Sequence, residues 1–76
     1  MKLHKISPNC TEIVHQDKTV LFSYSTPVAC HISGIGFART EKNHSRTTSK
    51  HIGTWLKLNG AYSVSVKPQA FFDSFL

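Results

Sequence analysis

The clearest alternation of apolar and polar positions in the first half of the chain is TVLFSYS, residues 19–25. Val20, Phe22 and Tyr24 fall on one face of this segment, which is the period of a half-buried β-strand. Pro27 then predicts a bend or bulge at a sheet edge, where a missing N–H is tolerated. The same pattern predicts further strands at TEIVH (11–15), VACHI (28–32) and FART (37–40), the last two joined by a glycine-rich turn.

The spacing of apolar residues changes after this point and predicts a helix from Thr48 onward. Ile52, Trp55 and Leu56 recur at helical intervals, and Asn59-Gly60 supplies a stop signal. Hydroxyl side chains immediately before the helix are of the type that caps free backbone N–H groups.

The C-terminal quarter predicts one more strand and one more helix. AYSVSV (61–66) alternates strictly, with Tyr62, Val64 and Val66 on one face. Pro68 suits a first helical position and opens PQAFFDSFL. An apolar face of this helix would serve either as core or as a homodimer contact, and its residues are Phe71, Phe72, Phe75 and Leu76.

The order of these elements, β-β-β-α-β-α, predicts an α+β fold in a single domain spanning residues 1–76. We expect a small antiparallel sheet of three to four strands with one or two helices packed on one face. The N-terminal MKLHKIS, broken by Pro8, fits either an edge strand or a loose arm. A chain this short has room for one sheet–helix interface and little more.

The charge balance favours an anionic partner. Nine lysines and arginines against four acidic residues give a net charge of +5. Such an excess fits a nucleic acid or an acidic protein surface, although it also serves plain solubility. No apolar run is long enough for a membrane span or a signal peptide, so we expect no membrane association and a cytoplasmic location.

The basic residues concentrate around SRTTSKH, residues 45–51. A helix start carries unpaired N–H donors and partial positive charge, so the arginine and lysine here have the parts of an anion site. The alternative is a capped helix start with a solvated basic face. The candidate binding residues are Arg39, Lys42, Ser45, Arg46, Thr47, Thr48, Lys50, His51 and Lys57.

The remaining reactive residue types do not predict catalysis, a metal or a cofactor. His44 and His51 are seven residues apart, and no histidine or cysteine pair has the spacing of a zinc site. Cys10 and Cys30 are outside any CxxC motif, and an apolar strand around Cys30 predicts an inert, reduced thiol. The aromatic residues, including Tyr24, fall on predicted core faces rather than on a base-stacking surface. We therefore expect a protein that is not an enzyme.

FSYSTPVA (22–29), the later RT, and SRTTSKHIGTWL (45–56) together resemble a family of very small proteins of tailed bacteriophages and archaeal viruses. The likeness to their SYxTPVA…T…S-TT-KH pattern covers about residues 19–58. It implies a viral accessory protein in the host cytoplasm and carries no mechanism. The matching positions are Ser23, Tyr24, Thr26, Pro27, Val28, Ala29, Thr40, Ser45, Thr47, Thr48, Lys50 and His51.

Three functions fit these observations. The first is a non-catalytic binding module that holds a nucleic-acid backbone at the basic helix start. The second is an inhibitor of host defence, similar to an anti-CRISPR protein, that docks on a host complex. The third is a minor structural protein of the virion.

Overall fold

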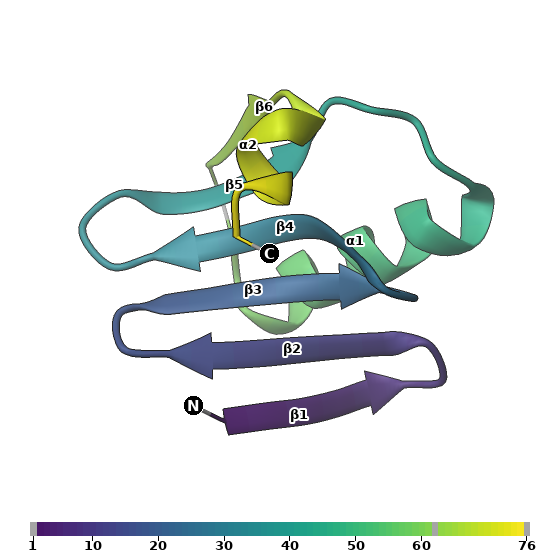
Figure 1. Cartoon of the computed structure of the whole chain (residues 1–76), viewed down its shortest axis with the longest axis horizontal. Helices are drawn as coiled ribbons and strands as arrows, with labels where there is room; N and C mark the ends of the chain where they lie inside the picture. Colours follow the sequence, from purple (N-terminus) through teal and green to yellow (C-terminus); the bar gives the residue numbers. More distant parts are fainter. Residues whose placement is uncertain (1, 62, 76) are drawn as a thin grey trace.

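Six strands form one sheet with a helix on each side in the computed structural model of the chain (Figure 1), which describes residues 2–61 and 63–75. The strands are β1 (Lys2–Ser7), β2 (Cys10–His15), β3 (Lys18–Ser23), β4 (Thr26–Ile32), β5 (Gly36–Thr40) and β6 (Val64–Lys67). The helices are α1 (Arg46–Leu58) and α2 (Gln69–Asp73). Neither helix has the length and apolar character that crossing a membrane requires.

The strands lie side by side in the order of the sequence, β1-β2-β3-β4-β5-β6. The first five are joined by short turns and pair antiparallel. β6 pairs parallel with β5 because α1 lies between them in the chain and returns it to the same end of the sheet. The sheet is therefore mixed.

Pro27 does not end the strand that contains it. β4 runs through Pro27, and the pairing with β3 shifts there, since Leu21 lies opposite Ala29 while Phe22 lies opposite Pro27. Val28 is the extra residue, which confirms the predicted bulge, although β4 is an interior strand and not an edge. The bulge allows Val28 and Ala29 both to join the core beneath α1.

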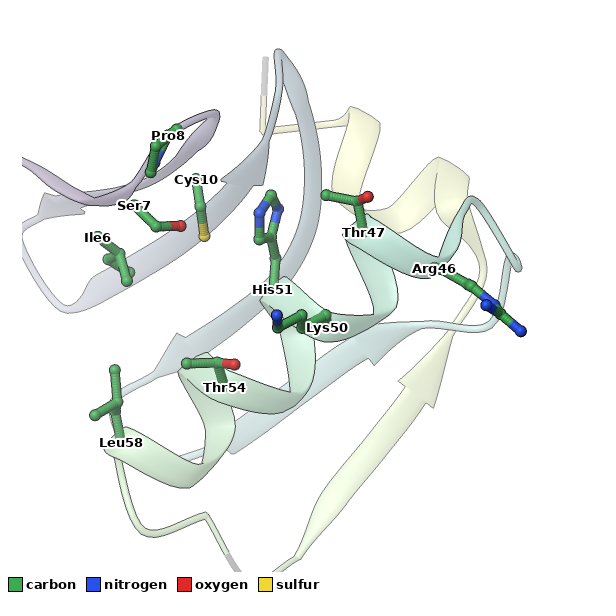
Figure 2. A pocket seen from close by; sticks show the side chains of 10 residues that line it. All are labelled: Ile6, Ser7, Pro8, Cys10, Arg46, Thr47, Lys50, His51, Thr54 and Leu58. Atoms are coloured by element: carbon green, nitrogen blue, oxygen red, sulfur yellow. The ribbon is translucent and has the colours of Figure 1, made fainter.

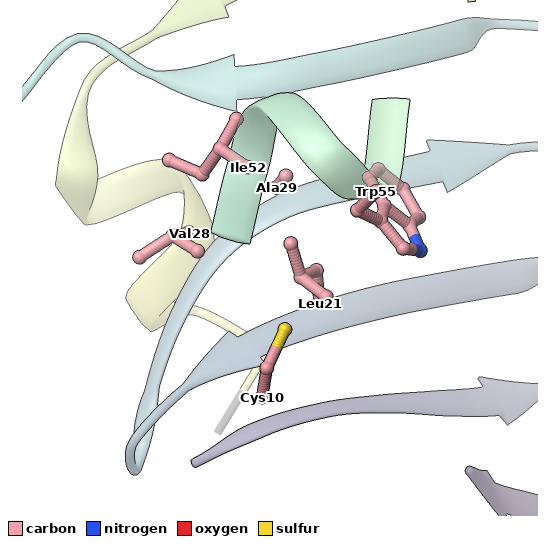
Figure 3. Packing of buried hydrophobic residues seen from close by; sticks show 6 residues of the cluster. All are labelled: Cys10, Leu21, Val28, Ala29, Ile52 and Trp55. Atoms are coloured by element: carbon pink, nitrogen blue, oxygen red, sulfur yellow. The ribbon is translucent and has the colours of Figure 1, made fainter. Parts of the chain in front are cut away.

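Each face of the sheet carries its own core. On one face α1 packs on a cluster shown in Figure 3. Its members are Cys10, Leu21, Val28, Ala29, Ile52 and Trp55. On the other face α2 covers a second cluster, whose members are Val20, Cys30, Ala38 and Phe72. In Figure 1 the two helices accordingly lie behind and in front of the strands.

α1 starts and stops where local sequence signals place its ends. Ser45 is the N-cap, with an extended backbone and an Oγ that accepts the Thr48 N–H at 3.1 Å. At the other end Gly60 adopts a φ of 64°, and its N–H donates to the Lys57 carbonyl at 3.1 Å. The predicted cap and stop are confirmed, and the helix begins at Arg46, slightly before the predicted start.

The C-terminal phenylalanines belong largely to the core. Phe72 is fully buried, and Phe71 and Phe75 pack beside it. Pro68 precedes α2 as its N-cap instead of occupying its first turn. The predictions that involve Tyr62 and Leu76 lie outside the described residues.

The predicted architecture is wrong in three respects, although the fold remains α+β. The described part of the chain has a six-stranded sheet instead of three to four strands, the sheet is mixed instead of antiparallel, and the helices pack on opposite faces. The reason is that the central strands bury both faces: Leu21 and Val20 are neighbours, yet each joins a different core. A one-face interpretation of alternation misses the second core.

Candidate functional site

A groove of about 540 Å³ separates α1 from the hairpin formed by β1 and β2 (Figure 2). Its helix wall consists of Arg46, Thr47, Lys50, His51, Thr54 and Leu58. Its hairpin wall consists of Ile6, Ser7, Pro8 and Cys10. The groove exists because α1 packs on the central strands and leaves the flank of the helix facing an uncovered part of the hairpin.

The ionisable side chains of arginine, lysine and histidine that line the groove are all basic. Arg46 and Lys50 are exposed and lie one helical turn apart on the same side of α1. Figure 2 shows His51 pointing toward the hairpin, while Arg46 extends past the helix start. No carboxylate is among the lining residues of the described chain. Glu12 is close in sequence to the hairpin wall, but it accepts a hydrogen bond from the Trp55 indole at 2.8 Å beneath the helix.

A buried hydroxyl network holds the helix wall against the sheet. Ser23 of β3, only 2% exposed, hydrogen-bonds through its Oγ with Thr48 Oγ1 and with His51 Nδ1, both at 2.9 Å. The Ser45 hydroxyl donates to Thr48 Oγ1 at 3.3 Å. Because Nδ1 is engaged inside the protein, Nε2 is the ring nitrogen of His51 that a ligand in the groove would contact.

Replacing Ser23 by alanine is expected to lower the free energy of unfolding by about 1–3 kcal/mol, since Thr48 and His51 lose a buried partner. The matched control is Ser25→Ala in the following exposed turn, which should change stability by less than about 0.5 kcal/mol. Urea denaturation followed by circular dichroism measures both. Equal stability of the two variants would mean that the network does not anchor the helix wall.

In the structure only some of the nine predicted binding residues lie at the groove. Arg46, Thr47, Lys50 and His51 line the groove, whereas Ser45 and Thr48 shape its helix start through the cap and the buried network.

The other three predicted residues lie outside the groove lining. Arg39 is on β5, where its Nε donates to the Thr40 carbonyl at 3.5 Å. Lys42 is exposed in the loop that follows, and Lys57 is exposed in the last turn of α1. These three basic residues therefore contribute nothing to the lining of the groove.

His44 belongs to a different part of the molecule from His51. Its Nε2 donates to Gln69 Oε1 at 2.9 Å, and Thr40 Oγ1 donates to the same oxygen at 2.8 Å. Gln69 also donates to the Pro27 carbonyl at 2.8 Å, so this amide fastens α2 to the sheet. Within residues 2–61 and 63–75 no three histidine, cysteine or acidic side chains group as metal ligands do.

The Cys10 thiol and the Ser23 hydroxyl near the groove are buried, as is usual for side chains with a structural role. Cys10 is a buried free thiol, and burial raises its pKa despite a hydrogen bond with Ser7. Burial likewise raises the pKa of Cys30, which lies in the second core on the opposite face of the sheet. A thiol with a raised pKa forms little of the nucleophilic thiolate at neutral pH. Ser23, although hydrogen-bonded to a histidine, is buried away from solvent.

Tyr24 lies near the groove, beside His51, although the sequence pattern predicts it in the core. The predicted core position is wrong, because Tyr24 occupies the β3–β4 turn, is 55% exposed, and has its ring centroid 6.2 Å from that of His51. The polar Ser25 and Thr26 that follow, ahead of Pro27, are the sequence signal that the strand ends at Ser23.

Comparison with known proteins supplies a family and no activity. No curated protein and no solved structure matches the chain. A family model matches residues 1–74, which includes both walls of the groove. The chain therefore belongs to a family of unknown function (DUF8033).

Proposed function

We propose that this protein is a non-catalytic binding module that holds a nucleic-acid backbone in the groove between α1 and the β1–β2 hairpin. The observation that carries the proposal is that two exposed basic residues one helical turn apart, Arg46 and Lys50, both line a groove whose described lining contains no carboxylate. Bound phosphates would replace the missing counter-charge. The net charge of +5 adds a long-range attraction for the same partner.

The side chains of the groove suit a phosphate polymer better than a single carboxylate. The guanidinium of Arg46 can form two parallel hydrogen bonds to a phosphate, and Lys50 supplies a second charge about 5–6 Å along the helix. The hydroxyls of Thr47 and Thr54 are neutral donors for backbone oxygens. Ile6 on the hairpin wall and Leu58 at the far end of the helix wall also line the groove and offer apolar contact to a sugar or base.

The salt dependence of binding tests this function. A labelled oligonucleotide titrated with the protein in fluorescence anisotropy should bind more weakly as salt rises. The slope of log K against log[salt] should be about −1.4 to −2.7, as expected for two or three phosphates neutralised. A protein without affinity for nucleic acid at low salt, or with an affinity that salt does not change, would contradict the proposal.

A second candidate function is favoured by a separate surface. On the α2 side of the sheet, Ile13, Val20 and Phe22 line a hollow of about 380 Å³, together with Ser74 and Phe75, which follow α2. Lys18 and His15 lie at the same hollow. Such an apolar surface with basic neighbours would suit docking on an acidic protein, in line with the inhibitor of host defence that the viral resemblance suggests. A nuclease-resistant protein partner in a pull-down from host lysate would favour this function over the first.

A further inference from the structure

We propose that Tyr24 is a stacking platform for an unpaired base, so that the ligand of the groove is a single-stranded nucleic acid. This inference rests on the proposed function and specifies its ligand. Tyr24 is an exposed aromatic residue beside the basic helix wall of the groove.

Two contacts tie Tyr24 to the two walls of the groove. Its ring lies 6.2 Å, centroid to centroid, from His51, which is part of the helix wall. Its backbone N–H donates to the Asn9 carbonyl at 2.6 Å, and Asn9 follows Pro8 in the turn that forms the hairpin wall. The β3–β4 turn is therefore tied to the hairpin wall through its backbone, and the Tyr24 ring lies beside His51 of the helix wall, outside the lining of the groove itself.

The backbone of Tyr24 makes an aromatic side chain an unexpected choice at this position. Its φ is 60°, a conformation that glycine and asparagine adopt easily and that is strained for a bulky residue. With 55% of the residue exposed, the ring gains little from burial that would offset this strain. A glycine would form the turn more favourably, and beyond its contact with His51 the ring keeps an exposed surface on which a ligand could stack.

An exposed aromatic ring beside basic side chains favours single-stranded over double-stranded nucleic acid as the ligand. In a duplex the faces of the bases are already stacked on each other, so the ring of Tyr24 has no base face to stack on. An unpaired base offers its face, and stacking of bases on aromatic rings next to a basic groove is a common way of binding single strands. The neighbouring backbone phosphates would then lie over the cations of the groove.

The test compares Tyr24→Gly with Tyr24→Phe in anisotropy titrations of a short labelled oligothymidine strand and of a duplex of the same length. Tyr24→Gly should weaken binding of the single strand about 5- to 100-fold, whereas Tyr24→Phe should retain it. Binding of the duplex should change less than twofold in either variant. The thermal midpoint of Tyr24→Gly should equal or exceed that of the wild type, because glycine relieves the strained turn.

Ser25→Gly is the matched control for added turn flexibility, and it should bind the single strand as the wild type does. Undiminished affinity of Tyr24→Gly for the single strand would overturn the stacking role and leave the basic groove in place. Equal losses in Tyr24→Gly and Ser25→Gly would also overturn it, since flexibility alone would then explain the effect. A wild type that binds neither probe would remove the proposed function and this inference together.

Discussion

Replacing Trp55 by alanine is expected to lower the free energy of unfolding by about 3–5 kcal/mol. Trp55 is 1% exposed and packs in the core beneath α1 with Leu21 and Ile52. Its ring meets that of Phe37 edge-on at 5.6 Å, and its Nε1 donates to Glu12 at 2.8 Å. The substitution therefore opens a cavity, removes an aromatic pair, and leaves a carboxylate without its indole donor.

The consequence for so small a chain is close to complete unfolding. At about 0.05–0.15 kcal/mol per residue, the whole domain would be stable by only about 4–11 kcal/mol. Urea denaturation followed by far-ultraviolet circular dichroism measures the loss without relying on tryptophan fluorescence. Leu58→Ala is the control on the same helix, where the side chain is largely exposed and the expected change is below about 0.5 kcal/mol. A loss smaller than about 1 kcal/mol in Trp55→Ala would contradict this packing of Trp55.

Reversing both charges of the groove, Arg46→Glu with Lys50→Glu, should weaken nucleic-acid binding at least about 100-fold. Each charge-assisted hydrogen bond that is lost contributes about 1.5–3 kcal/mol, and the two new carboxylates repel phosphates. The fold should tolerate the change, because both side chains are exposed and α1 has no acidic residue in its first turn. A glutamate at position 46 interacts favourably with the positive end of the helix.

The matched control reverses two lysines away from the groove, Lys18→Glu with Lys67→Glu, and so changes the net charge by the same amount. Lys18 starts β3 beside the ring of Phe75, and Lys67 ends the strand β6. We expect this control to lose no more than about tenfold in affinity, through the weaker long-range field. Equal losses in the two double variants would show that binding follows net charge, and would remove the groove as the site.

Local signals in the sequence predicted α1 well because its ends depend on neighbouring residues. The Ser45 hydroxyl that caps the helix and the Gly60 that closes it each act within a few residues of the backbone groups they satisfy. Ile52 and Trp55 also follow from spacing alone, because residues three and four apart share a helix face.

The alternation of apolar and polar residues did not predict two features of the sheet, the strand β1 and the exposed position of Tyr24. β1 is an edge strand with its first four residues exposed, so it has no apolar face to alternate, and its pairing with β2 is made by backbone groups that sequence does not display. Tyr24 continues the alternation of Val20 and Phe22, yet the turn begins at that residue. The sequence alone could not decide whether an aromatic at a strand end is core or surface.

In the SRTTSKH segment some features follow from the local sequence, while others depend on tertiary packing. Its cap and its charges follow from the residue types at a helix start. Its buried partner, Ser23, is 25 residues from Thr48 and 28 from His51 in the sequence, and only packing of α1 on β3 brings them together.

The sequence by itself determined the α+β class, the C-terminal end and amphipathic face of α1, and the excess of positive charge, because each depends on composition or on near neighbours. The tertiary structure alone decided the six-stranded order, the placement of the helices on opposite faces, and the groove. The groove joins residues 6–10 to residues 46–58, and such long-range contacts arise from the packing of whole elements. Residues that are separated this far in the chain leave no periodic signal of their meeting.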